Sequence, residues 1–412
     1  MTRTATERPV WEVAEVIRRH GDDFLAKHGG WLTSTQRQAL RELARCRTAA
    51  LGGHVDRCLD CAGERIAYNS CRNRHCPKCQ AGARARWLQH ESAYLLPVEY
   101  YHVVFTLPAE VADLAQTNPK PLYEMLFQAA AATLRQVAAN PKWLGAAVGL
   151  LLVLHTWGQN LHHHPHVHGV VTGGGLSCNA QGVVDEAPRW LACRPGFFLP
   201  VRVLSRLFRG KFLALLRAAF DQGQLRFAGP LAALAEGTAF ARWLTPLYAK
   251  EWVVYSKPPF GGPEQVLKYL ARYTHRVAIS NHRLVDVSAG QVTFRYKDYA
   301  ADQRQRTLTL TADEFLRRFV QHVLPKHFVK IRHYGLLANR QRTQRLHQCR
   351  RLLLVTAALA TVPNDAGAPL TEIVAPPPCC PHCGGSRLVR RALAAERGTA
   401  APNGCSRACN SS

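Results

Sequence analysis

The sequence predicts an α+β fold with a helical, cysteine-rich N-terminal domain, a central antiparallel sheet with helices, and a basic C-terminal extension. Residues 1–50 carry apolar side chains at helical spacing, and a segment rich in cysteine and histidine follows over 54–80. Residues 100–172 then show the order strand, helix, strand, strand, which is typical of α+β folds. The periodicity is lost from Leu353 onward. These changes divide the chain into residues 1–95, 96–345 and 346–412.

The first unit begins with helices. Val13, Val16 and Ile17 fall on one helical face, and Thr33 followed by Gln36 is the pattern of a capping box at the start of a second helix. After the cysteine-rich segment, residues 84–88 are expected to continue as a basic helix. The first unit therefore ends near residue 95.

The middle unit opens with a strand. Residues 100–108 are β-branched and aromatic up to a proline, which predicts a buried strand, and a helix is expected over 120–139. Residues 148–157 and 165–172 are predicted strands on either side of a turn near Asn160. This order of elements gives the sheet at least one hairpin.

The second half of the middle unit starts with an amphipathic helix. Between Arg202 and Leu234, apolar side chains alternate at helical spacing with Arg and Lys on the other face. A strand over 252–255 and a helix over 264–275 are expected next. Short strands are predicted over 277–280, 284–287, 291–296 and 306–310. Prolines at 376–378 introduce a tail that is expected to be mobile apart from one cysteine knuckle.

Composition indicates a globular protein with a polyanionic partner. The chain has 412 residues, of which 47% are hydrophobic, and 53 Lys and Arg against 28 Asp and Glu give a formal charge of +25. This charge favours nucleic acid first and an anionic membrane second. No apolar run is long enough to span a bilayer, and charged residues interrupt any N-terminal signal segment, so a cytoplasmic location is expected.

Cysteine spacing points to a zinc knuckle in the first unit. The chain has 14 cysteines, and in a reducing compartment paired CxxC turns are metal ligands before they are disulfides. Cys58 and Cys61 are followed, after a gap of 14 residues, by Cys76 and Cys79, which predicts one structural Zn²⁺. Cys71, His75 and His54 lie inside or beside this segment, so an exchanged ligand or a second ion stays open. Basic residues that are expected to contact DNA phosphates lie within this segment: Arg72, Arg74 and Lys78.

A second candidate metal site lies in the histidine run at residues 162–168. His164, His166 and His168 are spaced by two, so in a strand their imidazoles share one face while Val167 points to the core. Pro165 removes a ladder hydrogen bond and makes His164 the weakest of the three. His155 or Gln159, on the preceding predicted strand, is the alternative third ligand.

Two tyrosines share a face of the helix expected over 264–275. Tyr269 and Tyr273 are four residues apart, and phenolate nucleophiles are stabilised by cations nearby. Taken alone, tyrosines at this spacing are more often packing residues than nucleophiles. The cations expected here, which are also candidate DNA contacts, are Lys268, Arg272 and Arg276.

The combination resembles the HUH-type rolling-circle transposases of the IS91 group of bacterial insertion sequences, along nearly the whole chain. The matching motifs are residues 68–80, 102–108, 160–168, 258–273, 294–299 and 330–339. His327 departs from the resemblance, because a glycine is expected there and a local turn can differ. The end of the chain after Arg390 also departs from it.

The resemblance implies an HUH-type, RRM-like catalytic sheet over 96–345 that nicks and rejoins DNA. It implies Mg²⁺ or Mn²⁺ at His166 and His168, and Tyr269 with Tyr273 as nucleophiles that form a 5′-phosphotyrosine link. The implied partner is DNA, especially single-stranded or hairpin ends of an insertion sequence.

Three other functions remain open at the level of sequence. A plasmid replication initiator or relaxase uses the same chemistry. A zinc-dependent DNA-binding regulator without catalysis leaves the histidine strand and the tyrosine pair unexplained. A metallohydrolase needs a general base, and no acidic residue accompanies His164, His166 and His168.

Overall fold

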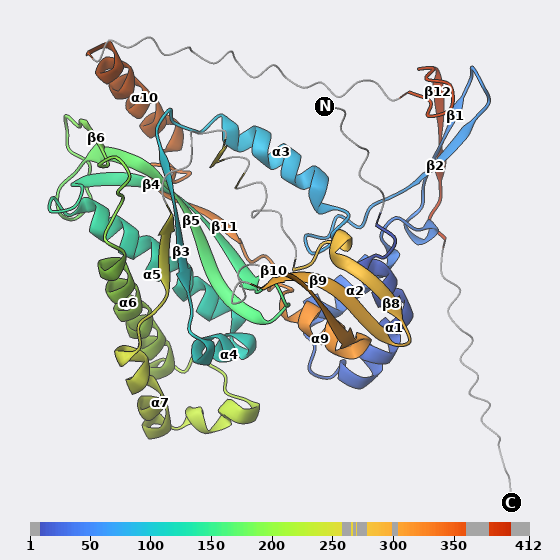
Figure 1. Cartoon of the computed structure of the whole chain (residues 1–412), viewed down its shortest axis with the longest axis horizontal. Coiled ribbons are helices and arrows are strands. Elements are labelled where there is room, and N and C mark those ends of the chain that lie inside the picture. The colour runs from blue at the N-terminus through green and yellow to red at the C-terminus, as the bar shows by residue number, and fades with distance from the viewer. Residues whose placement is uncertain are drawn as a thin grey trace, which may run out of the picture.

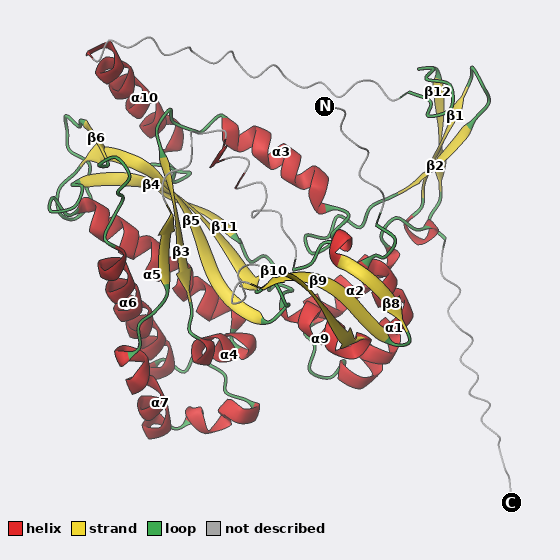
Figure 2. Cartoon of the chain, in the orientation of Figure 1, coloured by secondary structure: helices red, strands yellow, loops and turns green. Residues whose placement is uncertain are grey.

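The computed structural model describes residues 9–257, 265–266, 269, 278–298, 304–359 and 379–396. The described chain combines helices with antiparallel sheets and carries cysteine clusters in its N-terminal region (Figures 1 and 2). The predicted α+β class is therefore confirmed. The helix predicted over 264–275 lies largely outside the described residues.

The central sheet has six strands, and every pair in it is antiparallel. Five of its strands follow the order β11-β4-β5-β3-β7, and β6 pairs with the far end of β5. The strands are β3 (Tyr100–Thr106), β4 (Ala146–Trp157), β5 (His163–Ser177), β6 (Trp190–Ala192), β7 (Val254–Lys257) and β11 (Ile331–Gly335). The long β5 lies between β3 and β4, so its side chains have neighbours on both sides.

Helices cover one face of this sheet. Val167 of β5 and Phe105 of β3 are opposite each other and fully buried in the core that the helices complete. The helices are α4 (Ala109–Thr117), α5 (Pro119–Ala139), α6 (Val201–Asp221) and α7 (Gly237–Ala249). Because side chains alternate along a strand, His166 and His168 belong to the opposite face. Because Val167 points into the core, its neighbours His166 and His168 must point away from it.

The amphipathic helix predicted between Arg202 and Leu234 is shorter than expected. It ends at Asp221, and Gly223 follows with φ +63°, a left-handed conformation that stops a helix. Residues Gly229–Ala235 then form a separate 3₁₀ segment, η2. The predicted single helix is therefore wrong in its second half, because apolar spacing continues across a glycine that breaks the backbone.

A second body combines the N-terminal helices with residues 278–321. Its elements are α1 (Val13–His28), α2 (Ser34–Arg45), η3 (Asn281–Arg283), β8 (Leu284–Ser288), β9 (Gln291–Asp298), β10 (Arg304–Thr311) and α9 (Ala312–Gln321). They share one core, and the backbone N–H of Val13 donates to Oδ1 of Asn281 at 3.1 Å. The core thus crosses the expected boundary at residue 95. Ala278 and Ile279 are buried here without forming the predicted strand.

Besides the sheet of β8, β9 and β10, a third, three-stranded sheet joins an N-terminal hairpin to a strand from the C-terminal part of the chain. Strand β12 (Leu388–Leu393) pairs antiparallel with β1 (Gly53–Cys58), which also pairs with β2 (Glu64–Tyr68) (Figure 1). Helix α10 (Arg342–Leu359) and helix α3 (Gln80–Ser92) complete the described elements, with the 3₁₀ segment η1 (Ala49–Leu51). Two expectations for the tail are corrected: α10 extends past Leu353, and residues 388–393 are a paired strand.

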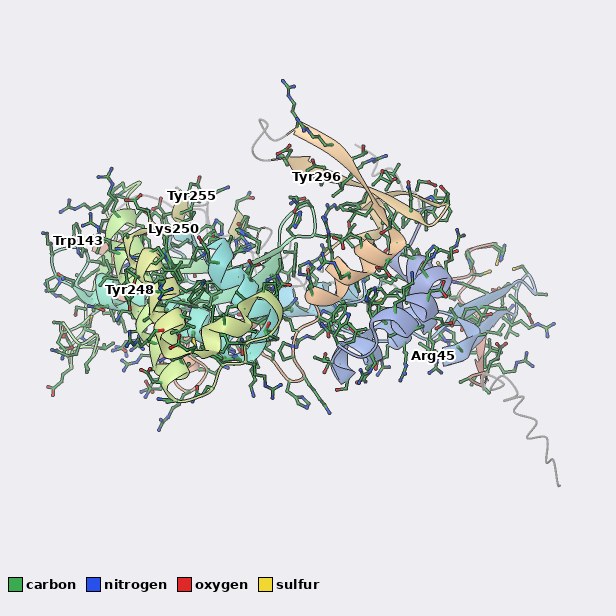
Figure 3. All side chains as sticks on the ribbon, turned by 90° about the horizontal axis from the view of Figure 1, so that it is seen from below. Arg45, Trp143, Tyr248, Lys250, Tyr255 and Tyr296 are labelled. Carbon is green, nitrogen blue, oxygen red and sulfur yellow. The ribbon has the colours of Figure 1, made fainter. Side chains whose placement is uncertain are left out.

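The two bodies lie at opposite ends of the molecule. In Figure 3 the labelled Arg45, at the end of α2, lies far from Trp143 and Tyr248 of the body built on the central sheet.

Within the described residues, no helix has both the length and the apolar character needed to cross a membrane. His327 has φ +60°, which agrees with the glycine expected at that position.

A candidate metal centre and two cysteine clusters

Three histidines converge on the face of the sheet opposite α4, α5, α6 and α7. His155 of β4 lies directly opposite His166 of β5 in the antiparallel register, and His168 follows two residues later. One ring nitrogen from each of the three lies within 4.8 Å of the others. Imidazoles at these separations can share one metal ion as ligands.

Hydrogen bonds orient two of these imidazoles. Nδ1 of His166 lies 2.6 Å from the backbone carbonyl oxygen of His164. Because a carbonyl only accepts, that Nδ1 carries the proton and Nε2 keeps its lone pair. Nδ1 of His168 lies 2.9 Å from Nε2 of His102, in β3. In both residues Nδ1 is thus engaged by a partner and Nε2 is the nitrogen left for a metal.

Burial keeps His166 and its neighbour His102 uncharged near neutral pH. Desolvation lowers the pKa of His166 to about 4, and desolvation lowers the pKa of His102 to about 3. Neutral imidazole is the form that binds a metal. His166 is therefore in the metal-binding form at neutral pH.

His164 lies outside this group, and His155 takes the position that was predicted for it. The pairing of β3 with β5 ends at Thr106 opposite His166, and the pairing of β4 with β5 shifts register after His155. His164 therefore lies in β5 at this irregularity, between the pairs of His163 with Trp157 and His166 with His155, where it is exposed and its carbonyl oxygen contacts His166. The alternative ligand His155 joins the group, whereas Gln159 lies in the turn that follows β4.

Tyr269 lies beside the histidines. Its hydroxyl is 2.9 Å from Nε2 and 3.2 Å from Nδ1 of His102, whose ring stacks on that of His168 with centroids 5.1 Å apart. The geometry therefore brings one predicted tyrosine next to the predicted metal ligands. The other residues expected with Tyr269 lie outside the described part of the chain: Tyr273, Lys268, Arg272 and Arg276.

Sequence reasoning missed His102. It lies in the strand that was predicted from residues 100–108, but its role depends on cross-strand register, which one strand does not reveal. A signal was present in the strand itself, because His102, Val104 and Thr106 are spaced by two and share one face, on which His102 is a titratable residue in an otherwise largely apolar strand. A polar residue in an otherwise apolar strand indicates which face of the sheet could carry a functional site.

The eight clustered cysteines form two groups that divide the predicted zinc site. Cys46, Cys71, Cys76 and Cys79 form the first cluster, and Cys58, Cys61, Cys380 and Cys383 form the second. The predicted set of Cys58, Cys61, Cys76 and Cys79 is therefore corrected. Cys58 lies at the far end of β1, a strand about 17 Å long, whereas Cys46 precedes its start, so β1 separates the cysteines of the two clusters.

The first cluster has the dimensions of a zinc tetrathiolate. Sγ of Cys79 lies 3.6 Å from Sγ of Cys46 and 3.6 Å from Sγ of Cys71. A Zn–S bond of about 2.3 Å gives a tetrahedron with an edge of about 3.8 Å. Cys71 was an open alternative in the sequence, whereas Cys46 was missed because 24 residues separate it from Cys71.

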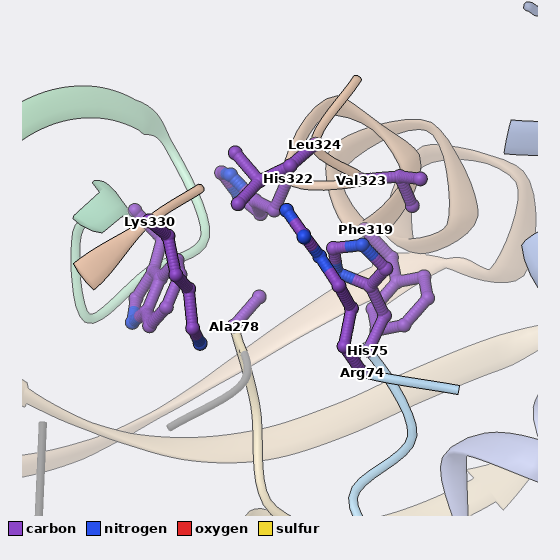
Figure 4. Close-up of a pocket in the computed structure, with 9 residues that line it drawn as sticks. Arg74, His75, Ala278, Phe319, His322, Val323, Leu324 and Lys330 are labelled. Carbon is purple, nitrogen blue, oxygen red and sulfur yellow. The ribbon is translucent and has the colours of Figure 1, made fainter. Parts of the chain in front are cut away.

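The predicted DNA-binding residues of this segment have different surroundings. Arg72 is exposed, whereas Lys78 forms an ion pair of 2.5 Å with Glu12. Arg74 donates through Nη1 to the carbonyl oxygen of Phe328 at 2.7 Å and lines a cavity of about 20 Å³ (Figure 4). Lys330 lines the same cavity, and burial lowers its pKa to about 7. Of the three, only Arg72 is exposed to a nucleic acid.

Comparisons with known proteins identify the family. Residues 149–345 match a family model described as "Putative transposase", and residues 16–107 match one described as "Transposase zinc-binding domain". A protein of Sinorhizobium fredii named "Putative transposase y4qJ" is 54% identical over 358 residues, which cover 87% of each chain. The chain belongs to the IS91 family of transposases.

A second relative of this transposase is named for its element. The transposase for insertion sequence element IS801 of Pseudomonas savastanoi pv. phaseolicola is 30% identical over 322 residues, which are 77% of this chain and 73% of the relative. No solved structure matches the chain. Family membership agrees with a DNA-acting transposase that carries an N-terminal zinc-binding domain.

Proposed function

We propose that this transposase nicks and rejoins single-stranded DNA at insertion-sequence ends through a tyrosine that becomes linked to the DNA 5′-phosphate. The observation that carries the proposal is the position of Tyr269, whose hydroxyl lies 2.9 Å from His102, itself 2.9 Å from His168. A nucleophile next to a potential metal site is the arrangement that phosphodiester transesterification needs.

The donor set fits a divalent metal with open positions. His155, His166 and His168 supply three nitrogens from two adjacent strands, which leaves the remaining coordination positions for phosphate oxygens and water. We propose Mg²⁺ or Mn²⁺ at this site, and Mn²⁺ is used in the tests below because Mg²⁺ depends more strongly on oxygen ligands. When bound, the ion polarises the scissile phosphate and stabilises the charge that develops on its oxygens.

The chain's own residues provide the nucleophile and its orientation. In the cleavage step, the Tyr269 oxygen forms a bond to phosphorus, the bond from phosphorus to O3′ breaks, and the phenolic proton ends on the released 3′-OH. Attack by a 3′-OH on the phosphotyrosine reverses the step and rejoins DNA, so no external energy source is required. His102 holds the Tyr269 hydroxyl through the contacts at 2.9 and 3.2 Å.

Tyr273 is proposed as the second nucleophile. It follows Tyr269 by four residues, so on a continuous helix both phenols project from one face. One tyrosine could then hold the cleaved donor strand while the other receives the next end. Lys268, Arg272 and Arg276, from the same segment, are proposed to stabilise phenolate and phosphate charge.

The test is formation of a covalent protein–DNA adduct. Labelled single-stranded oligonucleotides that tile both ends of the element are incubated with the full chain and Mn²⁺, and adducts are separated under denaturing conditions. We expect an adduct with the natural chain, a strong loss with Tyr269→Phe, and complete loss with Tyr269→Phe combined with Tyr273→Phe. His166→Ala should also abolish the adduct through loss of metal binding.

Tyr248→Phe is the matched control, because Tyr248 lies on the exposed surface of α7. It removes the same hydroxyl from the chain and should leave adduct formation unchanged. A doubly substituted protein that retains the natural fold and the natural level of adduct would rule out the tyrosine mechanism.

A further inference from the structure

We propose that Cys58, Cys61, Cys380 and Cys383 bind a second structural zinc ion, which fastens the C-terminal segment to the N-terminal ribbon of β1 and β2. The matched zinc-binding domain ends at residue 107 and therefore contains only two of these four cysteines. The other two, Cys380 and Cys383, lie more than 300 residues away in sequence. Cys380 contacts Cys61, and Cys383 contacts Cys58.

The sulfur positions fit one shared ion. Sγ of Cys58 lies 3.6 Å from Sγ of Cys383, Sγ of Cys61 lies 3.6 Å from Sγ of Cys380, and all four lie within 4.8 Å of one another. A disulfide needs about 2.05 Å between its sulfurs, whereas a zinc tetrathiolate needs about 3.8 Å along each edge, from Zn–S bonds of about 2.3 Å. The observed separations match the tetrahedron.

Each CxxC pair lies in a tight turn of the kind that chelates zinc. In the first turn the backbone N–H of Asp60 points to Sγ of Cys58 at 3.4 Å. In the second, the backbone N–H of Gly384 donates to the carbonyl oxygen of Cys380 at 2.8 Å, and Gly384 has φ +76°. Glycine adopts this left-handed conformation without the strain that a side chain would add, and Ala62 takes a similar conformation, with φ +57°, directly after Cys61 in the first turn.

Ordinary protein contacts align the two turns. Strand β12 pairs with β1 from Gly53 opposite Leu393 to Cys58 opposite Leu388. Arg390 forms a bidentate ion pair with Asp56, at 2.6 and 3.0 Å, and Arg387 forms another with Asp60. The pairing of β12 with β1 therefore places the turn that contains Cys380 beside the turn that contains Cys58.

The ribbon needs such a fastening because it buries little apolar surface. Leu59, Ile66 and Val389 are each more than half exposed, at 58, 56 and 52%. No residue of β1, β2 or β12 belongs to a hydrophobic core cluster of the described chain. A three-stranded sheet without an apolar core is marginal in water, and a structural metal supplies the missing stability.

The test is the zinc content of the full chain, purified under reducing conditions and freed of loosely bound metal. We expect two zinc ions per chain for the natural sequence and one for Cys380→Ser combined with Cys383→Ser. Cys379→Ser is the matched control, because Cys379 is the exposed neighbour outside the cluster, and it should keep two. One zinc in the natural chain, or two in the double variant, would overturn the proposal.

A ligand-preserving variant separates loss of a ligand from loss of folding. Cys383→His keeps a zinc-binding side chain and should retain the second ion, whereas Cys383→Ser should not. Substitution of Co²⁺ for zinc provides a second readout, because thiolate-to-cobalt absorbance should fall by about half in the double variant. Equal absorbance in the natural and double-variant proteins would contradict a second site, and neither result depends on DNA cleavage.

Discussion

At the scale of single residues, the candidate centre depends on what each imidazole's second nitrogen contacts. The carbonyl oxygen of His164 fixes His166, and the ring of His102 engages His168. The alternation of residues 164–168 predicted His166 and His168 correctly as a shared face, because side-chain direction is local. His155 and His102 were harder to assign, because their roles arise from the register between separate strands, which no single strand encodes.

His102 is expected to position His168 and Tyr269. His102→Ala should weaken Mn²⁺ binding by about tenfold or more, because partners behind a metal ligand typically carry effects of that size. Binding is measured by titration of free Mn²⁺ with electron paramagnetic resonance, in the absence of DNA. His102→Gln, whose amide oxygen can accept from Nδ1 of His168, should recover part of the affinity.

His347→Ala is the control for general effects of histidine removal, because His347 is exposed on α10. It should leave Mn²⁺ affinity unchanged. If His102→Ala also bound Mn²⁺ with natural affinity, His102 would have no role in orienting His168.

At the scale of elements, strands and helices with strong local patterns were predicted well. Helix α5 spans 119–139 where 120–139 was expected, and β3 begins at Tyr100 as expected. Helix α9 was missed although its sequence carries a helix-start signal, Thr311 followed three residues later by Glu314, and helices α4 and α7 were not predicted either. The prediction of a single zinc site was wrong because the 14 residues between Cys61 and Cys76 include β2. The hairpin of β1 and β2 places Cys58 and Cys61 in a different cluster from Cys76 and Cys79.

Helix α9 depends on its N-cap. The side-chain oxygen of Thr311 accepts from the backbone N–H of Glu314 at 3.2 Å. Thr311→Ala should therefore lower the free energy of unfolding by about 1 kcal/mol. Thr311→Ser keeps the hydroxyl and should recover most of the loss in denaturant melts, whereas equal losses in both variants would show that the cap contributes nothing.

At the scale of the whole molecule, the first unit packs against segments from the second half of the chain, and this could not be read from the sequence. Val13 contacts Asn281, and β1 pairs with β12, so the first unit takes core and sheet partners from later parts of the chain. Composition predicted a globular chain with apolar cores. It carried no information on which segments share those cores, because contacts between distant segments are set by the assembled surfaces.

Buried neutral histidines should make the whole fold sensitive to acid. Burial lowers the pKa of His322 to about 3, and its ring contacts Thr156 at 3.2 Å and the carbonyl oxygen of Leu161 at 3.1 Å. Unfolded histidine titrates near 6.5, so the unfolded chain binds more protons between pH 6.5 and about 3. Stability is thus full above pH 6.5 and falls as the pH is lowered through this window.

The expected loss from His322 alone is about 2 kcal/mol between pH 6.5 and 4.5. It is measured as the change in unfolding midpoint between these pH values in buffers free of divalent metal. His322→Gln should be less stable than the natural chain at pH 7 but should lose less on acidification. An unchanged pH dependence in that variant would show that His322 titrates normally in the folded chain.

The central claim is that the phenol beside the histidine cluster forms the covalent link to DNA. The most direct measurement is mass spectrometry of the peptide that carries the nucleotide after nuclease and protease digestion of the Mn²⁺-dependent adduct. We predict a 5′-phosphate on Tyr269, or on Tyr273 when Tyr269 is phenylalanine. A nucleotide attached to any other residue, or cleavage that leaves no covalent adduct, would contradict the account.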